Sequence, residues 1–352
     1  VTMSGFMTLF SQVLEQLRLA VVNVPGITPL ADAPFLFRPL VMVVLLGVVA
    51  GVIGVIINLR SAEFSAEAMV HAVFPGIVAG AVYWGINAII PAASVVAVAA
   101  ALVLTIVSHR SRRGEASEAG TAVVLTSFFS IGLILSLAKG DMSGQLEALM
   151  FGRLLEVTDE RLAQAFIVCA IALLLIVATW KEQVAYAFDR TGARASGLRL
   201  LALDLVLNTA IAAAVVSAST AVGTLLVIGY LVIPGATARI LVSRVRSMVA
   251  VAIAVGVGGG YLGMLLMTLP ETLDKPISPQ ATVALVMTTI LLLAVGVAAA
   301  RERLRRVVRQ ARSARPAPAA TTVASGADTG TASDEAEGVE GAVAPTAEGS
   351  RA

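Results

Sequence analysis

Residues 72–107 read AVFPGIVAGAVYWGINAIIPAASVVAVAAALVLTIV and contain no charged side chain. A second uncharged run extends from Leu205 to Ala238. A helix needs about 20 apolar residues to cross a bilayer, so each run is long enough for nearly two crossings. Across the 352 residues, 58% are hydrophobic and 14% are charged, whereas about a quarter of the residues of a soluble domain are charged. The sequence therefore predicts an all-α integral membrane protein.

The hydropathy pattern divides the chain into about nine transmembrane helices and so predicts a polytopic helical bundle. Residues 87–91 divide the first uncharged run, because Pro91 lacks a backbone donor and favours a turn. Residues 217–220 divide the second run. The expected spans are residues 39–59, 70–90, 91–107, 120–138, 162–180, 200–218, 220–242, 248–269 and 280–300.

The distribution of Lys and Arg predicts the orientation, because cytoplasmic loops have an excess of these residues. With the C-terminus in the cytoplasm, 19 of the 25 Lys and Arg residues fall in cytoplasmic loops or after residue 300. Nine spans then put the N-terminus outside. We expect a multi-pass protein of the cell membrane.

The two ends of the chain differ in character from the spans. Residues 5–22 would place apolar side chains on one face of a helix and polar side chains on the rest of it, which indicates an amphipathic helix in the membrane interface. The last 37 residues lack Leu, Ile, Met and aromatic residues, so they are expected to be disordered. The expected division is an external segment (1–38), a transmembrane domain (39–300), a basic juxtamembrane segment (301–315) and a disordered cytoplasmic tail (316–352).

The composition excludes several kinds of site. With only His71, His109 and Cys169 available, a His-rich hydrolytic site, a thiolate metal cluster and an intramolecular disulfide are not expected. The chain has no GxxxxGK[ST] stretch and therefore no phosphate-binding loop of its own. A net charge of +2 is too small to favour nucleic acid as a partner. We expect neither enzymatic activity nor a permanently bound cofactor.

Glu67 and His71 are candidate metal ligands at the start of the second span. Polar groups inside a membrane are costly, which makes each of them a functional candidate. The two residues are four apart, so a helix stacks them on one face. A carboxylate and an imidazole suit Zn²⁺, Mn²⁺ or Fe²⁺. The alternative is that these side chains form the hydrated end of a helix.

Two Pro-Gly pairs lie inside predicted spans and are candidates for the translocation path. They are Pro75-Gly76 and Pro234-Gly235. Such a pair frees backbone groups, and a broken helix is tolerated at membrane depth where it lines a cavity or other protein. We therefore expect an interruption of the helix at each pair.

The region 181–198 between the fifth and sixth spans is rich in small residues and is either an ordinary loop or a short helix presented to a soluble partner. After it, Asp204 and Asn208 are again four apart, and we expect Asp204 to cap a helix at the interface. His109 lies in a basic loop and is expected to be solvated.

Several of these segments resemble one known family. Glu67-x-x-x-His71-Ala-Val-Phe-Pro-Gly-Ile resembles the Asp-Ala-Leu-Ser-His-Ala-x-Leu-Pro-Gly-x signature of the membrane subunits of metal-ion (zinc, manganese or iron) ABC importers, the ABC-3 type permeases. Residues 187–198 look like that family's Phe-Asp-x-x-x-Ala-x-x-x-Gly pattern. Residues 222–239 and 118–122 are similar to its seventh span and to the start of its fourth. Two departures are Glu67 for aspartate and Val70 for serine.

The resemblance implies a vitamin-B12-importer-like permease (type II ABC importer) that is a homodimer in the membrane. It also implies an ABC ATPase subunit on the cytoplasmic side and an extracytoplasmic metal-binding protein. Glu67 and His71 would contact the transported Zn, Mn or Fe ion. The residues expected to couple the permease to the ATPase are Phe188, Asp189, Ala193, Gly197 and Leu198.

Two other functions remain open at this point. The first is a permease for a metal chelate or another small substrate. The second is a secondary transporter that needs no ATP, although this would favour acidic residues deep in the bundle. The uncharged runs contain none.

Overall fold

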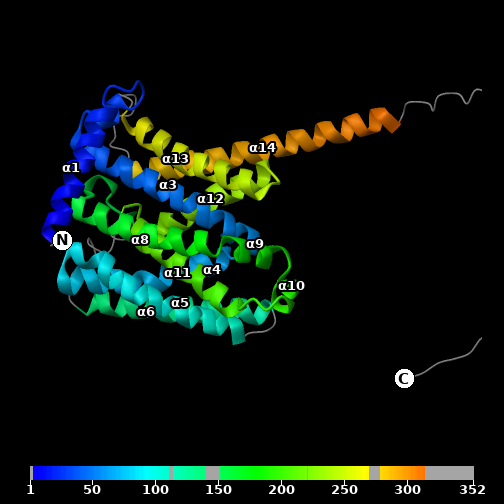
Figure 1. The fold of residues 1–352 in the computed structure, drawn as a ribbon, viewed down its shortest axis with the longest axis horizontal. Helices are drawn as coiled ribbons and strands as arrows, with labels where there is room; N and C mark the ends of the chain where they lie inside the picture. The colour runs from blue at the N-terminus through cyan, green and yellow to red at the C-terminus, as the bar shows by residue number, and fades with distance from the viewer. Residues whose placement is uncertain (1–2, 111–113, 139–150, 220, 269–277, 314–352) are drawn as a thin grey trace, which may run out of the picture. The chain divides into compact units, whose positions relative to one another are not determined.

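The computed structural model describes residues 3–110, 114–138, 151–219, 221–268 and 278–313, and within them every element is helical (Figure 1). The predicted all-α membrane fold is therefore confirmed. Eight helices of the described residues are long and apolar enough to cross a bilayer, and α12 is a shorter apolar helix where the seventh span was expected. The predicted tail 316–352 lies outside the described residues.

The helices follow the predicted spans closely but extend beyond several of them. The two N-terminal helices are α1 (Met3–Val21) and α2 (Thr28–Ala31). The long helices are α3 (Pro34–Arg60), α4 (Glu63–Ala79), α5 (Ile89–Arg110), α6 (Gly114–Leu137), α8 (Asp159–Ala178), α11 (Leu200–Ser219), α12 (Thr224–Leu241), α13 (Val245–Thr268) and α14 (Pro279–Ser313). Two short helices, α9 (Trp180–Phe188) and α10 (Arg190–Ala195), connect α8 with α11.

The breaks within the two uncharged runs are confirmed. After α4, a π-helical segment (Gly80–Trp84) leads to Gly85, whose φ of 87° needs a residue without a side chain. A 3₁₀ turn (Ile86–Ala88) then starts α5. In the second run, Gly223 has the same φ of 87° and precedes α12.

The expected interruptions at the Pro-Gly pairs are wrong. Helix α4 continues through Pro75 to Ala79, and α12 continues through Pro234 to Leu241. Helix α6 packs closely against α4 at this point: Gly132 has no side chain, and a Cβ there would lie 3.0 Å from the backbone nitrogen of Pro75. The irregular turn of α4 comes later, at the π-helical segment.

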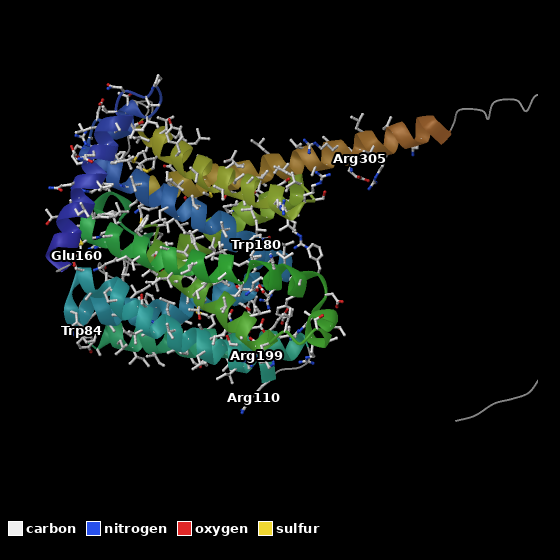
Figure 2. All side chains as sticks on the ribbon, in the orientation of Figure 1. Trp84, Arg110, Glu160, Trp180, Arg199 and Arg305 are labelled. Atoms are coloured by element: carbon white, nitrogen blue, oxygen red, sulfur yellow. The ribbon has the colours of Figure 1, made fainter. Side chains whose placement is uncertain are left out.

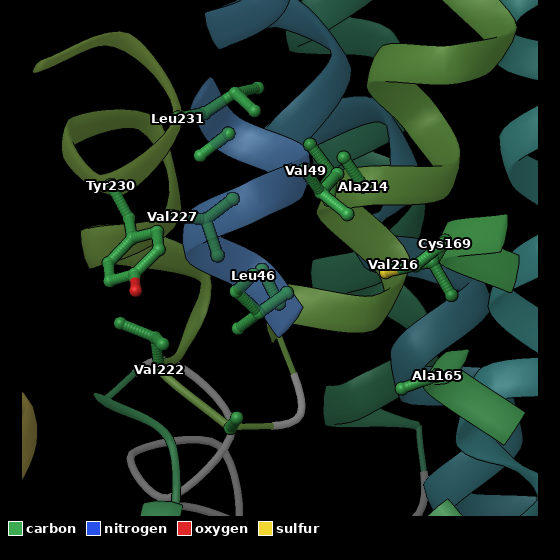
Figure 3. Close-up of a cluster of buried hydrophobic side chains, with 14 of the residues drawn as sticks. Leu46, Val49, Ala165, Cys169, Ala214, Val216, Val222, Val227, Tyr230 and Leu231 are labelled. Atoms are coloured by element: carbon green, nitrogen blue, oxygen red, sulfur yellow. The ribbon is translucent and has the colours of Figure 1, made fainter. Parts of the chain in front are cut away.

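The most apolar and most buried of these spans is α3, which contacts α12, α13 and α8. Glycines allow these helices to approach closely: a Cβ on Gly47 of α3 would lie 2.6 Å from the Gly256 backbone of α13. In the same core, the Tyr230 hydroxyl of α12 donates to the Val43 carbonyl of α3 at 2.8 Å. Figure 3 shows Tyr230 near Val227 and Leu46, within one buried apolar cluster. A second group of helices, α4, α5, α6 and α11, packs on the other side of the bundle (Figure 1).

Candidate functional site

The predicted metal ligands lie in the second and third turns of α4, which begins at Glu63. Glu67 is exposed and His71 is half-buried. The His71 ring meets Phe129 of α6 edge-on, with 5.3 Å between ring centroids, and Phe74 contacts the same ring. The imidazole is therefore held against α6, while the carboxylate remains accessible. Val70, at the position of the family's serine, is buried and provides no hydroxyl.

Glu67 and His71 supply two donors from one helix face, which is fewer than the four ligands of a closed zinc site. Among the described residues, no group of three or more His, Cys, Asp and Glu side chains is placed to hold a metal ion. A cation at this position would complete its ligand shell with water, backbone oxygens, a chelator or a second chain. Such an incomplete shell suits a transported ion, which has to leave, better than a structural one.

The Pro-Gly pairs lie at helix contacts in this conformation. Pro75, Gly76, Pro234 and Gly235 are all buried. A Cβ on Gly76 would lie 2.8 Å from the Ala93 Cα of α5. Gly235 of α12 lies against the backbone of α3. The glycines therefore set how closely α4 and α12 approach their neighbours.

An apolar cavity of about 200 Å³ lies between α12 and α14. Leu226, Gly229 and Ile233 line it from α12, and Ala284 and Met287 line it from α14. Its lining has no carboxylate, imidazole or thiol. These are the side chains that usually hold a divalent cation in a protein, so the lining gives no support for a metal site in this cavity.

The predicted coupling residues lie on α9 and α10 and in the turn that follows, so this region contains short helices and is not an ordinary loop. Asp189 separates the two helices, and its Oδ1 accepts the Gly192 backbone N–H at 2.8 Å as the N-cap of α10. Gly197 has a φ of 82° with open space beside it. The side chain of Phe188 is 71% exposed, which gives the two helices an accessible aromatic group.

The inner side of α9 and α10 is fixed to the bundle. Ala193 and Tyr186 are buried in a small apolar cluster with Leu200 and Leu203 of α11, and Leu198 packs against it. Burial raises the pKa of the Tyr186 phenol, and the neighbouring Asp204 carboxylate raises it further. The phenol is therefore neutral and donates to Asp204 Oδ2 at 3.4 Å.

A polar cluster beneath α9 was not predicted. Arg60, the last residue of α3, forms an ion pair with Asp204 of α11 and donates to Gln183 Oε1 of α9 at 2.7 Å. Its guanidinium also lies over the Tyr186 ring, 3.9 Å from Cζ to the ring centroid. The expectation that Asp204 caps a helix is therefore wrong, because this carboxylate neutralises an arginine 144 residues away in sequence.

His109 belongs to the same cluster, and the expectation that it is fully solvated is also wrong. Its Nδ1 lies 3.7 Å from Asp204 Oδ2, and 28% of its side chain is exposed. The sequence does contain a signal for this cluster: Arg60, His109 and Asp204 all fall at the ends of predicted spans on one side of the membrane. Because Arg60 and Asp204 have opposite charges at the same membrane depth, an ion pair between them could have been predicted from the sequence.

The bundle has two distinct ends. Arg110 and Arg199 lie toward the end that also holds α9 and α10, here called the α9 end (Figure 2). Trp84 and Glu160 lie toward the opposite end, called the Trp84 end (Figure 2). At the Trp84 end, Asp159 pairs with Arg38 at the start of α3. Both ends of α3 are therefore held by an ion pair with another helix.

Comparison with known proteins gives consistent matches. The model of the ABC 3 transport family matches residues 32–298. The manganese transport system membrane protein MntC of Listeria monocytogenes is 34% identical over 231 residues, which are 65% of this chain and 80% of that protein. The chelated iron transport system membrane protein YfeC of Yersinia pestis is 31% identical over 63% of this chain and 75% of its own. The solved structure of PsaBC from Streptococcus pneumoniae in complex with Fab has a TM-score of 0.65 and 26% identity, covering 76% of this chain and 94% of that one.

Proposed function

This chain belongs to the ABC 3 transport family, and from that premise we propose that it is the permease subunit of an importer for a divalent metal ion, zinc, manganese or iron. ATP is hydrolysed on a separate subunit, and the permease itself has no enzymatic activity. The match over residues 32–298 is the main support, because it includes both the α4 motif and the α9–α10 region.

The proposed metal contacts are Glu67 and His71. Their spacing puts an oxygen and a nitrogen donor on one face of α4, and relatives of this chain are named for manganese and chelated iron. Pro75, Gly76, Pro234 and Gly235 are the proposed path residues, since α4 and α12 would have to separate from their neighbours at these close contacts. The metal is cargo, so no permanently bound cofactor is proposed.

The proposed partners follow from the two ends of the bundle. An ABC ATPase would bind the α9 end at Phe188, which is exposed there. The proposed coupling residues are Phe188, Asp189, Ala193, Gly197 and Leu198. The α9 end would be cytoplasmic, as its arginines favour, with the N-terminus outside. An extracytoplasmic metal-binding protein would deliver the ion at the Trp84 end, and a second copy of the chain would complete the permease.

A metal chelate is the second candidate cargo, and the relative named for chelated iron favours it. A chelate brings its own ligands, so two donors on α4 would suffice to contact it. A secondary transporter without ATP is disfavoured by the family match.

Metal-stimulated ATPase activity of the reconstituted complex tests the proposal, with Zn²⁺, Mn²⁺, Fe²⁺ and a ferric chelate compared at equal free concentration. Stimulation by a free divalent ion and uptake of that ion into the vesicles are expected. Stimulation by the chelate alone would favour the second candidate. Uptake without the ATPase subunit would contradict the proposal.

A further inference from the structure

We infer that Arg60 is a positioning residue that transmits movement of α9 and α10 to α3 and, through α3, to α12. The inference deepens the proposed function and rests on it, because it assumes that an ATPase moves the two short helices. Arg60 itself contacts neither the cargo nor the ATPase in this proposal. It connects α9 and α10, the two helices that a partner would move, to α3, the most buried span of the bundle.

The first step of the transmission is from α9 to Arg60. Gln183 and Tyr186 are three apart on the buried side of α9, and both contact the Arg60 guanidinium. Gln183 has no exposed surface, and its amide nitrogen also donates to the Leu203 carbonyl of α11 at 2.9 Å. Trp180 and Val184 add apolar contacts with the core. Apolar contacts are non-directional, whereas the hydrogen bonds of a planar guanidinium fix an orientation.

The second step is from the end of α3 to α12. Asn58 lies two residues before Arg60, and its carbonyl oxygen accepts a hydrogen bond from the Arg239 guanidinium of α12. The Asn58 amide nitrogen donates back across the same junction to the Val232 carbonyl at 3.3 Å. The last turn of α3 is therefore bonded to α9 and α11 on one side and to α12 on the other. A shift of Arg60 would therefore be transmitted through these hydrogen bonds to the α12 segment that contains Pro234 and Gly235.

The third step concerns the strength of the connection. Only 9% of the Arg60 side chain and 20% of the Asp204 side chain are exposed, so salt screens this pair less than a surface pair. His109 and Tyr186 also face the Asp204 carboxylate, and Arg190 lies 5.8 Å from the Tyr186 ring. Loss of Arg60 would therefore leave Asp204 with two remaining neighbours, and the chain is expected to fold and insert without it.

The test uses the full complex in liposomes and compares Arg60→Ala with Arg38→Ala. The control removes the other ion pair of α3, at the Trp84 end. Allosteric coupling free energies correspond to about fivefold or more, so Arg60→Ala should raise the number of ATP molecules hydrolysed per metal ion imported by at least about that factor. ATPase co-purification should be unchanged, and Arg38→Ala should keep the unaltered ratio. Arg60→Lys should give an intermediate ratio, because an ammonium cannot hold Gln183, Asp204 and the ring together.

A second readout does not depend on the cargo. In a Cys169→Ala background, Ile240→Cys puts a single thiol on α12, and its labelling rate by a polar maleimide is measured with and without ATP. ATP should change the rate in the background chain and have little effect when Arg60→Ala is added. If no metal is imported but this difference is seen, the proposed cargo is wrong and the role of Arg60 stands. An equal ATP response with and without Arg60, or no response in either, would overturn the inference.

Discussion

Gly235 of α12 lies directly against the Gly54 carbonyl group of α3, and neither position has room for a Cβ. The Gly54 carbonyl also accepts a hydrogen bond from the Asn58 amide at 2.8 Å. A Cβ on Gly54 would meet the Leu231 carbonyl oxygen of α12, which is backbone and cannot rotate away. The spacing between α3 and α12 is therefore set by two glycines far apart in the sequence.

Gly54→Ala is expected to destabilise the chain by about 1–3 kcal/mol, the usual cost of overpacking a well-packed core. The measurement is the thermal unfolding midpoint of the purified chain in detergent. Gly258→Ala on α13 is the matched control, because a Cβ there has nothing within 4 Å. Equal midpoints for the two variants would mean that the α3–α12 contact is looser than described.

Glu67→Gln and His71→Ala should each reduce metal uptake by about tenfold or more, the range seen when metal-site groups are altered. Uptake of radiolabelled metal into cells at matched expression is the measurement. Glu63→Gln removes a carboxylate one turn earlier in α4 and should have a small effect. If all three variants behaved alike, the hydrated-end interpretation of this segment would be correct and the ligand hypothesis wrong.

Phe188→Ala should weaken binding of the ATPase, because exposed aromatic residues often contribute about 2 kcal/mol or more once an interface buries them. Trp84→Ala is a matched control, since both side chains are 71% exposed but lie toward opposite ends of the bundle. The measurement is the affinity of the ATPase subunit for the chain in nanodiscs. Equal retention of the ATPase by both variants would contradict the assignment of the α9 end.

The spans could be predicted from the sequence because the bilayer imposes long uncharged runs. The breaks at Gly85 and Gly223 lie close to the predicted divisions but outside them. The continuity of α4 through Pro75 could not be predicted. Helix α4 tolerates the loss of the backbone hydrogen bond that Pro75 cannot donate. The close packing of α6 at Gly132 could not be predicted either, because hydropathy carries no information about which helices are neighbours.

In the candidate site, too, features within one helix could be predicted from the sequence, whereas contacts between helices could not. The spacing of Glu67 and His71 predicted that they share a helix face, since this depends on one helix only. The contact of His71 with Phe129 and the pairing of Arg60 with Asp204 join residues from different helices. The i, i+4 pattern of Asp204 and Asn208 was misleading, because the two side chains have different partners: Asn208 donates to Thr105 of α5 at 2.9 Å.

The proposed orientation can be tested with introduced thiols, because the chain has a single cysteine, Cys169, which is fully buried. A membrane-impermeant maleimide should leave the unaltered chain unlabelled in intact cells. Tyr83→Cys, at an exposed position in the π-helical segment at the Trp84 end, should be labelled from outside. Ser196→Cys, an exposed position after α10, should be labelled only after the cells are permeabilised. The reverse labelling pattern would put the α9 end outside the cell, where no ATPase could reach Phe188. That result would contradict the importer hypothesis.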